Sequence, residues 1–533
     1  MNRFVHALLA VVALACAVQS ATAAQPGTMR VDYFHTGGRG AEVFALDRVA
    51  IEPLPWPGNM SRTIDDGLAG TYRFEVRDRN GTVLYARGFS SIYAEWVTTA
   101  EAGTSSRTFH ESLRFPAPVE AVQVALFKRD PQQAFQPVWQ TTVDPTDMFV
   151  DRAAPPPQQL LAIERHGESA DKADLLLLGD GYTAAECAAK FRLDALRMTA
   201  ALFRHQPFAS RRSDFNVWGL CPPCSESGIS RPSTGIQHRT PVGATYDAFG
   251  TERYILTFDN RALREVASRA PYEALTILAN GRTYGGGGIY GALSTVAVDS
   301  VWADYLFVHE FGHHFAALAD EYYTSPVAYE PADSLVEPWQ PNVTALLDSE
   351  HLKWRRLMST STPVPTPWPK ADFEERQRDF EARRRQMRAE RRPESDMDAL
   401  FREEQAYTTA LFRAAENAHA VGAFQGANYD ARAFYRPQLD CVMFTRNDVA
   451  FCRVCQDALE RVIDLYAGGG RLDRDLKKDS PRGRTGRTTP RPSSGLAAAQ
   501  SLFRNYVFCF AAAEPISRLS PGGVQTLRQP FDL

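Results

Sequence analysis

The feature that most constrains the fold of this 533-residue chain is a strand followed at once by a long helix, over residues 173–203. The run ADLLLLGD has an uninterrupted apolar centre and predicts a buried strand. After the turn at Gly181, Thr183 and Glu186 have the spacing of a helix-capping box, and an amphipathic helix pattern follows. A strand that leads through a glycine turn into a capped helix is typical of an α/β domain.

Further strands and helices extend this domain. The runs DFNVWGL and YILTFD predict strands, and REVASRAPYEALTILANG predicts a helix that leads into another strand. We therefore expect an α/β (α+β) domain over residues 173–465. Within it, residues 370–420 combine mixed charges with apolar residues at roughly helical spacing, which predicts a charged, exposed helical insertion interrupted at Pro393.

Residues 25–150 have the pattern of strands alone. Segments rich in Val, Tyr, Phe and Thr alternate with polar residues, and the RNGT sequence at 79–82 favours a hairpin, because Asn and Gly can adopt the positive φ of a primed turn. We expect an antiparallel β-sandwich, in which His35 and His110 are ordinary polar residues rather than metal ligands. The proline-rich residues 151–172 predict a stiff linker between the two domains.

The two ends of the sequence predict segments outside these domains. Residues 1–24 combine Arg3, an apolar run of about a dozen residues and small residues before position 25, which is the pattern of a signal peptide. The run is shorter than the roughly 20 residues that span a membrane, so we expect an exported protein, periplasmic or extracellular, without an integral membrane span. Residues 466–495 are rich in Gly, Pro, Arg and Ser and predict a disordered linker, which leaves a short C-terminal tail at 496–533.

Composition and cysteine content narrow the class of protein. A hydrophobic content of 44%, a charged content of 23% and a net charge of -4 are typical of a globular protein, rather than a disordered chain or a basic nucleic-acid-binding protein. Of the eight cysteines, Cys16 lies in the predicted leader, so an odd number remains and at least one is unpaired. The CPPC (221–224) and CRVC (452–455) pairs have the spacing of a four-cysteine zinc site, but in an exported protein we favour disulfides or free thiols.

The sequence HEFGH at residues 309–313 has the residue types of a catalytic metal site. Residues four apart on an α-helix lie on the same face, so His309 and His313 can share one Zn²⁺. Glu310 lies about 100 degrees further round the helix, where it is poorly placed as a ligand but well placed as a general base toward a metal-bound water. The surrounding apolar residues predict a buried helix, in which imidazoles without partners would be unfavourable. His314 faces elsewhere and is not included in the site.

The third ligand is open on sequence alone. In a continuous helix Asp320 would lie about 10 Å along the axis from His313, too far to share its metal ion. Either the helix ends near Ala317 and Asp320 folds back, or a remote carboxylate such as Glu337 binds from a second helix, with Glu321 as a neighbouring competitor. The sequence FAALAD contains no glycine that would indicate such a bend.

Four motifs together resemble the catalytic domain of the immunoglobulin A peptidase family of zinc metallopeptidases: GDGYT, YGGGGIYG, HEFGHHFAALADEYY and YRPQLDCVMF. The strand-rich region before the linker is similar to the N-terminal β-sandwich of that family, so the resemblance covers roughly residues 28–465. It implies that His309 and His313 are zinc ligands, that Glu310 is the base and that Asp320 is the third ligand.

The wider metzincin pattern fits less closely. That pattern has a glycine at the position of Ala316 and a metal ligand at the position of Ala319. Asp320 lies one residue beyond this ligand position, so its role as ligand is implied by the resemblance to the narrower family alone. Met443 resembles the Met-turn below metzincin sites, or is a core methionine. Tyr435 either assists an oxyanion or has a structural role.

A run of four glycines, Gly285 to Gly288, precedes a β-prone segment. No Lys-Ser or Lys-Thr pair follows at the spacing of a phosphate-binding loop, so the run is either a flexible hairpin tip or an edge strand. As an edge strand, the segment Gly287, Gly288, Ile289 and Tyr290 would align an extended polypeptide with the metal.

These observations predict an exported zinc-dependent endopeptidase: a metzincin-like α/β catalytic domain, preceded by a β-sandwich, that acts on a polypeptide substrate with one Zn²⁺. Two other functions stay open. The chain is alternatively a non-catalytic zinc-containing binding protein, or a zinc hydrolase of non-peptide amide bonds. The cleavage specificity is not encoded in these motifs.

Overall fold

The computed structural model describes residues 25–67, 69–324 and 335–468. The predicted signal peptide (1–24), the tail (496–533) and the predicted disordered linker from residue 469 onward lie outside the described residues. Within the described ranges, no helix is both long enough and apolar enough to cross a membrane.

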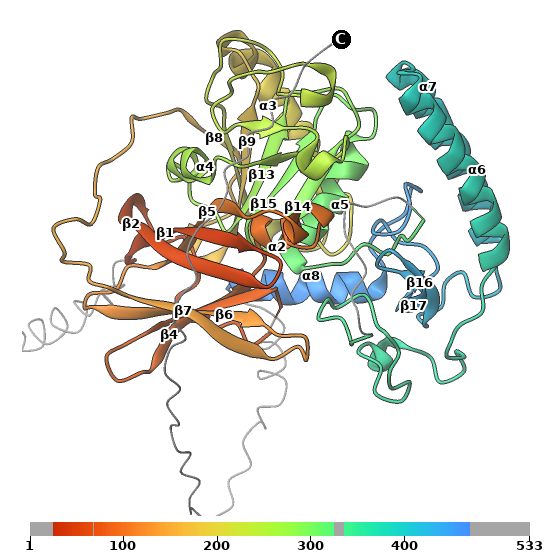
Figure 1. Cartoon of the computed structure of the whole chain (residues 1–533), viewed down its shortest axis with the longest axis horizontal. Coiled ribbons are helices and arrows are strands. Elements are labelled where there is room, and N and C mark those ends of the chain that lie inside the picture. The colour runs from red at the N-terminus through yellow and green to blue at the C-terminus, as the bar shows by residue number, and fades with distance from the viewer. Residues whose placement is uncertain (1–24, 68, 325–334, 469–533) are drawn as a thin grey trace, which may run out of the picture. The chain divides into compact units, whose positions relative to one another are not determined.

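The N-terminal region forms two antiparallel sheets, drawn in red and orange in Figure 1. Its strands are β1 (Gly27–Gly38), β2 (Ala41–Pro55), β3 (Tyr72–Arg77), β4 (Val83–Phe89), β5 (Arg107–Pro116), β6 (Val122–Arg129) and β7 (Phe135–Val143). The strand orders are β2-β1-β5 and β4-β3-β6-β7, and every neighbouring pair is antiparallel. Val31, Phe74 and Leu126 are among the residues of both sheets that form one buried apolar cluster.

The predicted hairpin at 79–82 is present, but its loop is longer than a two-residue primed turn. Arg77 pairs with Val83, and within the loop Gly81 has a φ of 83° whereas Asn80 does not have a positive φ. The Asp78 carboxylate instead accepts hydrogen bonds from the N–H groups of Asn80 and Thr82, each at 2.8 Å. An Asx-type loop therefore joins β3 to β4.

The two N-terminal histidines contact carboxylates. His35 is buried, with Nε2 3.0 Å from Glu42 and Nδ1 3.2 Å from Glu111. His110 Nε2 lies 3.2 Å from Asp47. The other nitrogen of His110, Nδ1, lies 3.1 Å from the Asn260 side-chain amide of the second region, so both nitrogens of each imidazole have a polar partner.

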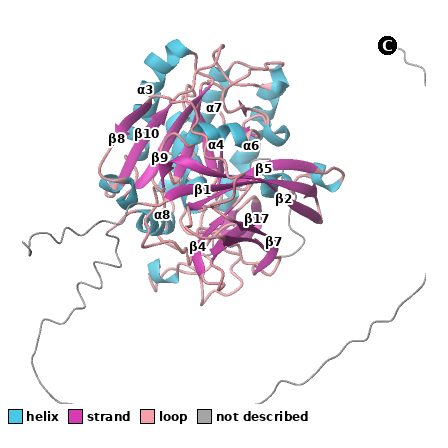
Figure 2. Ribbon diagram, turned by 90° about the vertical axis from the view of Figure 1, so that its left-hand side faces the viewer, coloured by secondary structure: helices cyan, strands magenta, loops and turns pink. Residues whose placement is uncertain are grey.

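The second region is built on a six-stranded sheet with the order β14-β15-β13-β9-β10-β8. Its strands are β8 (Leu160–Glu164), β9 (Ala173–Asp180), β10 (Phe215–Leu220), β13 (Ala274–Ala279), β14 (Gly286–Ile289) and β15 (Leu293–Ala297). The four inner strands are parallel, and the two edge strands are antiparallel to their neighbours. Figure 2 shows β8, β10 and β9 side by side. The chain therefore has a mixed α/β architecture, with antiparallel sheets at its N-terminal end.

Strand β8 lies within the segment that the sequence predicts as linker. Its residues pair with β10, and Leu161 and Ile163 pack against the buried cluster beneath the sheet. The prolines at 155–157 precede it, so only the first part of residues 151–172 has linker character. The short apolar run LLAI at residues 160–163 is the signal that the proline-rich composition obscured.

Helices cover both faces of the sheet. They are α3 (Ala184–Leu202), α4 (Asn260–Ala267), α5 (Ala303–Ala316) and α8 (Arg453–Tyr466). The predicted capping box is confirmed, because the Thr183 side chain accepts from the Glu186 N–H and the Glu186 side chain from the Thr183 N–H. Strand β9 is buried throughout, and its apolar centre faces both ways: Leu175 and Leu177 join the cluster with α3 and α5, while Leu176 and Leu178 join the cluster with α4.

Two helices, α6 (Lys370–Ala389) and α7 (Glu394–Arg413), occupy most of the predicted charged insertion. The break between them ends at Pro393, the N-cap of α7. Arg383 pairs with Glu403 across the two helices, while Phe380 and Leu400 are buried in the same cluster as α5. The insertion is thus exposed on its charged side only.

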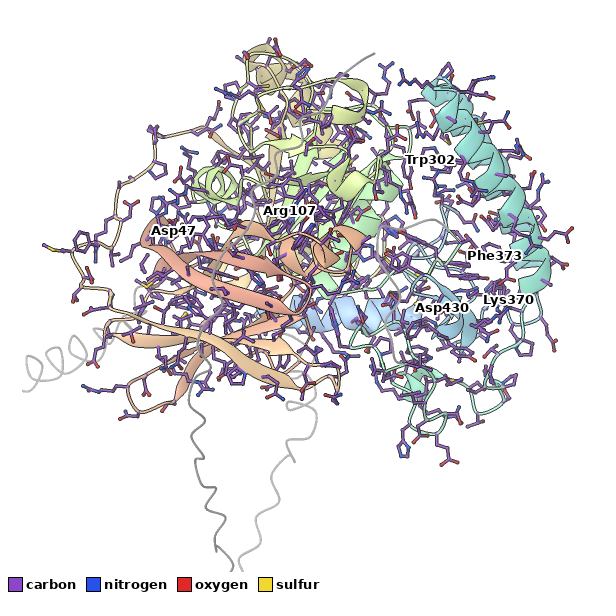
Figure 3. All side chains as sticks on the ribbon, in the orientation of Figure 1. Asp47, Arg107, Trp302, Lys370, Phe373 and Asp430 are labelled. Carbon is purple, nitrogen blue, oxygen red and sulfur yellow. A yellow bond between two sulfur atoms is a disulfide. The ribbon has the colours of Figure 1, made fainter. Side chains whose placement is uncertain are left out.

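The start of α6 contacts a hairpin that follows α7 in the chain. Figure 3 shows Lys370 and Phe373 beside Asp430, and the Lys370 ammonium donates to the carbonyl of Ala431 at 2.7 Å. That hairpin consists of β16 (Phe424–Ala427) and β17 (Asp430–Arg436); the remaining short elements are β11 (Ala244–Thr245), β12 (Leu256–Thr257) and α2 (Ile92–Trp96).

The N-terminal sheets contact the second region close to β14. The Ser90 N–H donates to the Tyr290 carbonyl at 2.9 Å, and the Arg114 guanidinium donates to the Tyr272 carbonyl at 3.0 Å. Thr71 and Ser90 consequently line the same cavity as His309 of α5.

Candidate metal centre and active site

Helix α5 brings the two histidines of HEFGH together. His309 and His313 lie one turn apart on the same face, and their Nε2 atoms are 3.1 Å from each other. The opposite face of the helix, which includes Phe307 and Phe311, is fully buried in the core. Because that face is fixed by packing, the direction of the two imidazoles is fixed as well.

The helix ends directly after this pair. Ala317 has left-handed backbone angles (φ 56°, ψ 30°), and the N–H groups of Ala317 and Leu318 donate back to the carbonyls of His313 and Gly312. This is a C-terminal cap of the left-handed type, formed here by alanine where glycine is usual. The chain after Ala317 therefore leaves the helix axis and returns toward the histidines.

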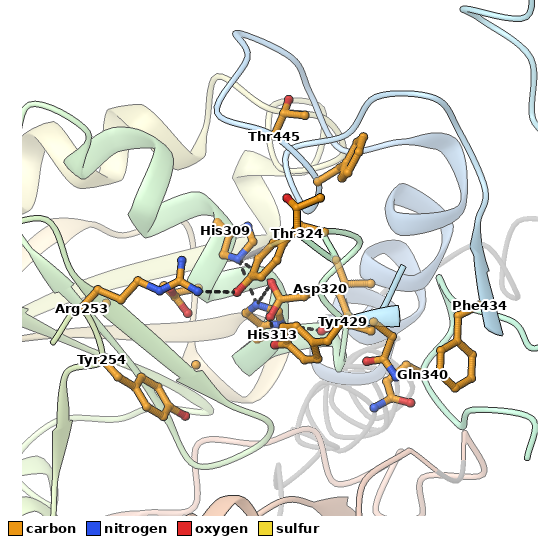
Figure 4. A pocket seen from close by; sticks show the side chains of 18 of the residues that line it. Arg253, Tyr254, His309, His313, Asp320, Thr324, Gln340, Tyr429, Phe434 and Thr445 are labelled. Atoms are coloured by element: carbon orange, nitrogen blue, oxygen red, sulfur yellow. Dashed lines mark hydrogen bonds and ion pairs between the residues drawn. The ribbon is translucent and has the colours of Figure 1, made fainter. Parts of the chain in front are cut away.

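Asp320 folds back onto the histidine pair. Its Oδ1 atom lies 3.0 Å from His309 Nε2 and 3.2 Å from His313 Nε2. Figure 4 shows the three side chains pointing toward one another, with Tyr429 beside Asp320. Of the two arrangements open on sequence, the structure has the bend at Ala317.

The backbone contacts of the imidazoles fix their tautomers. His309 Nδ1 lies 2.9 Å from the Val442 carbonyl, and His313 Nδ1 lies 2.5 Å from the Leu318 carbonyl. A carbonyl only accepts, so each Nδ1 carries the hydrogen, and in the neutral ring each Nε2 presents a lone pair. Two nitrogen lone pairs and a carboxylate oxygen thus face one another.

This donor set fits a metal ion. Three atoms bound at about 2.0–2.2 Å in tetrahedral geometry lie about 3.3 Å apart, close to the separations found here. Buried Asp320 Oδ1 faces these two Nε2 atoms, and when both carry lone pairs it has no hydrogen-bond donor, which is unfavourable unless a cation lies between the three atoms. His309, His313 and Asp320 are consequently the residues that would hold the ion.

Glu310 lies at the wall of the cavity that contains these donors. The cavity has a volume of about 670 Å³ and is lined on its other sides by residues such as Arg253, Tyr254 and Tyr290. Burial raises the pKa of the Glu310 carboxyl above its ordinary value, against the opposing effect of the two histidines. A carboxylate with a raised pKa beside a metal-donor set is suited to accept and release a proton.

Strand β14 packs so closely against helix α5 that side chains at Gly286 and Gly288 would clash with Glu310. A Cβ at Gly288 would be 2.5 Å from the Glu310 carbonyl oxygen, and one at Gly286 would be 2.9 Å from the Glu310 Cγ. Gly288 and Tyr290 line the cavity, whereas Ile289 is buried in the cluster with α4, and a Cβ at Gly287 would meet the ring of a neighbouring tyrosine. The predicted edge segment thus presents alternate residues to the cavity.

The outer edge of β14 is partly paired. Gly286 exchanges hydrogen bonds with Arg253 and Ile255, each at 3.1 Å, and the Tyr290 carbonyl accepts from Ser90. Gly288 lies between these two contacts. The part of the β14 edge with which an added strand could pair is therefore centred on Gly288.

The two alternative carboxylates lie in other contacts. Glu321 Oε1 accepts a hydrogen bond from Asn342 at 2.9 Å and faces a group of cysteines instead of the histidines. Glu337 accepts from the Thr344 hydroxyl at 3.1 Å and pairs with Lys353 at 2.9 Å. Asp320 is the candidate that the fold brings to the histidine pair.

Met443 and Tyr435 have different positions relative to the site. Met443 is buried below α5, where a Cβ at Gly312 would be 3.0 Å from its sulfur. Tyr435 pairs through its backbone with Thr344, and it is not among the residues that line the cavity. This position gives no support to a contact of Tyr435 with an oxyanion in the cavity.

His314 lies outside the donor set, as expected from its position on α5. Its Nε2 accepts from the Leu275 N–H at 3.0 Å, and its Nδ1 donates to the Ile289 carbonyl at 3.1 Å. Burial lowers the pKa of this imidazole to about 4, so the ring is neutral. It links α5 to two strands of the sheet.

The four-cysteine zinc site considered for CPPC and CRVC is not formed. Cys221 is bonded to Cys187 in a disulfide, and Cys224 is a separate free thiol. For the two CPPC cysteines, the favoured interpretation of disulfides or free thiols is confirmed.

Two polar partners of the site were not identified from the sequence. The Tyr429 hydroxyl donates to Asp320 Oδ2, and Asn342 bonds both the N–H and the carbonyl of Ala319 at 2.8 and 3.0 Å. Both side chains hold the segment that follows the bend at Ala317. Because the Tyr429 hydroxyl binds Oδ2 of Asp320, Oδ1 is the carboxylate atom that faces the histidines. The Asn428-Tyr429 pair is recognisable only as a turn.

We expect Tyr429→Phe to weaken metal binding about 10–100-fold, because loss of a group that orients a ligand has an effect of this size. The Asp320 carboxylate keeps its position in the chain but loses the donor to Oδ2. Competition with a chromophoric zinc chelator measures the change, and Tyr435→Phe is the matched control. An unchanged affinity in Tyr429→Phe would remove its hydroxyl from the support of Asp320.

Comparison with known proteins identifies two matching family models. The model described as IgA Peptidase M64 matches residues 161–463, and the model described as Peptidase M64 N-terminus matches residues 21–140. The first match begins within β8 and includes all the donors of the candidate centre. A comparison with curated proteins finds no match.

Proposed function

The chain belongs to the IgA peptidase M64 family, and on this premise we propose that it is an exported, zinc-dependent endopeptidase. The family match confirms the resemblance stated from the sequence motifs and implies a metallopeptidase, which is a hydrolase. One observation carries the finer proposal. The two Nε2 atoms and Asp320 Oδ1 converge to within 3.2 Å of one another beside the Glu310 carboxylate.

In this proposal each residue has a defined part. His309, His313 and Asp320 hold the ion, with the Val442 and Leu318 carbonyls fixing the imidazole tautomers. A bound Zn²⁺ would acidify a water molecule and polarise the scissile carbonyl. Glu310 accepts the proton of the attacking water at its carboxylate and later donates it to the leaving amine.

We further propose that an extended polypeptide adds to the edge of β14. The cavity-facing positions Gly288 and Tyr290 would contact it, and Gly287 and Ile289 would fix the strand from behind. The absence of a side chain at Gly288 supports this arrangement, because it lets β14 pack closely against α5 and so brings the open edge of the strand beside Glu310.

For the fold, we propose a metzincin-like catalytic domain preceded by a β-sandwich. The position of Met443 beneath Gly312 supports the first part. The buried cluster shared by the two N-terminal sheets supports the second. We also propose that the domain boundary lies in the proline-rich segment between Asp151 and β8.

Export is supported by two independent features. Residues 1–24 have the pattern of a signal peptide, and the Cys187–Cys221 disulfide is of a kind that persists in oxidising compartments.

The experiment is cleavage of unfolded casein and of a peptide library by the purified full chain, with and without a chelator. We expect peptide-bond cleavage that the chelator abolishes and stoichiometric Zn²⁺ restores. Bound zinc without cleavage of any polypeptide would favour the non-catalytic binding protein. Cleavage of non-peptide amide bonds only, such as those of cell-wall material, would favour a zinc hydrolase of that class.

A further inference from the structure

A second group of metal-ligand side chains lies beside the candidate centre. It consists of Glu321, Cys441, Cys452 and Cys455, whose ligand atoms all lie within 4.8 Å of one another. Each of these residues is at most 4% exposed. Glu321 directly follows Asp320, so consecutive residues of the chain face two different clusters.

The separations within the group match those of a tetrahedral site. Cys441 and Cys455 have their sulfur atoms 3.9 Å apart, and Cys455 Sγ is 3.5 Å from Glu321 Oε1. Two sulfur atoms that each lie about 2.3 Å from a tetrahedral zinc ion are about 3.8 Å apart, and a sulfur and a carboxylate oxygen about 3.6 Å. The sulfur distance also exceeds that of a disulfide, about 2.05 Å.

Backbone N–H groups are directed at the sulfur atoms. Cys441 Sγ accepts from the N–H groups of Cys452 at 3.3 Å and Met443 at 3.5 Å, and Cys452 Sγ accepts from the N–H of Cys455 at 3.4 Å. Cys452 is the N-cap of α8 and Cys455 lies in its first turn, where the helix dipole favours negative charge. These contacts stabilise thiolates more than thiols.

Glu321 supplies an independent observation. Its side chain is fully buried, and while Oε1 accepts from Asn342, Oε2 has no hydrogen-bond partner. The nearby Arg436 guanidinium donates to the Gly426 and Leu439 carbonyls. A buried carboxylate oxygen without a partner, among three sulfur atoms, is unfavourable unless a cation lies between them.

We infer that Glu321, Cys441, Cys452 and Cys455 bind a second zinc ion in a closed structural site. Thiolate ligands select zinc among the divalent ions common in proteins, and four protein ligands leave no position for a substrate or an activated water. Metal ligation also protects buried thiols from oxidation in an exported protein, where three neighbouring cysteines would otherwise favour a disulfide.

The second ion would stabilise the geometry of the first site. Glu321 follows Asp320 directly, and its N–H donates to the Met443 carbonyl at 2.9 Å. The adjacent carbonyl, that of Val442, holds His309. Fixing Glu321 to Cys441 and to the start of α8 thus fixes both the bend that returns Asp320 and the segment that orients His309.

The test measures zinc content and zinc ligands in the full chain. We expect wild type to hold two zinc ions per chain and Cys455→Ser to hold half as much. The matched control is Cys224→Ser, a free cysteine outside the group, which should keep both. In His309→Ala the remaining zinc should show X-ray absorption dominated by sulfur at about 2.3 Å.

Two results would overturn the inference. One is zinc in His309→Ala that is absent or bound by nitrogen and oxygen alone. The other is a disulfide between any two of Cys441, Cys452 and Cys455 in wild type, detected by mass spectrometry after alkylation without reduction. Should Cys455→Ser fail to fold, cobalt substitution of wild type decides the question. Thiolate-to-cobalt absorption bands support the site, and their absence excludes it.

Discussion

Glu310→Gln is expected to retain the metal at His309 and His313 while its kcat/KM for peptide cleavage falls about 10²–10⁴-fold. Glutamine has nearly the same size as glutamate, but its amide cannot accept the proton of the attacking water. Glu310 is not one of the three donors that converge in the cavity, so metal binding should not depend on its charge. The measurement combines zinc content with the rate of hydrolysis of one peptide substrate.

Asp304→Asn is the matched control, because it makes the same chemical change on the same helix. Asp304 lies in the first turn of α5 and forms partly exposed ion pairs with Arg197 and Arg204. Such pairs contribute about 0–1 kcal/mol, so cleavage should stay close to that of wild type. Full cleavage by Glu310→Gln would contradict the role of Glu310 as base.

Asp320→Ala is expected to lose the ion held with His309 and His313, and with it all metal-dependent cleavage. Only two imidazoles would remain as donors, and the buried oxygen that faces them would be absent. The loss of affinity should exceed the about 10–100-fold that follows removal of a supporting group. Zinc content by mass spectrometry, with cleavage measured in parallel, checks this prediction.

The comparison variant is Glu337→Ala, which removes the remote carboxylate that the sequence left as an alternative ligand. Glu337 contacts Thr344 and Lys353. We expect this variant to keep both zinc and activity. Retention of the histidine-bound zinc in Asp320→Ala, together with its loss in Glu337→Ala, would reverse the assignment.

Local sequence patterns were sufficient to predict β9 and the start of α3, which belong to the framework of the second region. The apolar run of β9 and the Thr183–Glu186 capping box identified a buried strand and the start of α3, because both depend on neighbouring residues only. Strand β8 was missed, since its register is set by pairing with β10, more than fifty residues further along. The prolines before it favoured a linker and obscured its short apolar run.

The histidine pair was predictable for the same reason, because the spacing of His309 and His313 places them on one helix face. The bend that brings Asp320 back was not. It requires left-handed angles at Ala317, an alanine in a sequence that otherwise favours a helix. Non-local contacts stabilise it, among them the bonds from Asn342 to Ala319 and from Tyr429 to Asp320.

The partners of the cysteines likewise depend on non-local contacts, which the local sequence does not reveal. The spacing of CPPC and CRVC left a shared zinc site open beside the favoured disulfides or free thiols, but it did not indicate that Cys221 is bonded to Cys187. The partners of Cys452 and Cys455 are Cys441 and Glu321, which the fold brings to the start of α8. A carboxylate ligand separated by more than a hundred residues from its partners has no local signature.

Anomalous diffraction at the zinc edge, on crystals of active full-length protein, locates the catalytic ion directly. We expect a peak about 2 Å from His309 Nε2, His313 Nε2 and Asp320 Oδ1, on the side of the cavity that contains Glu310. Active protein whose zinc lies away from these three atoms would exclude them as its ligands.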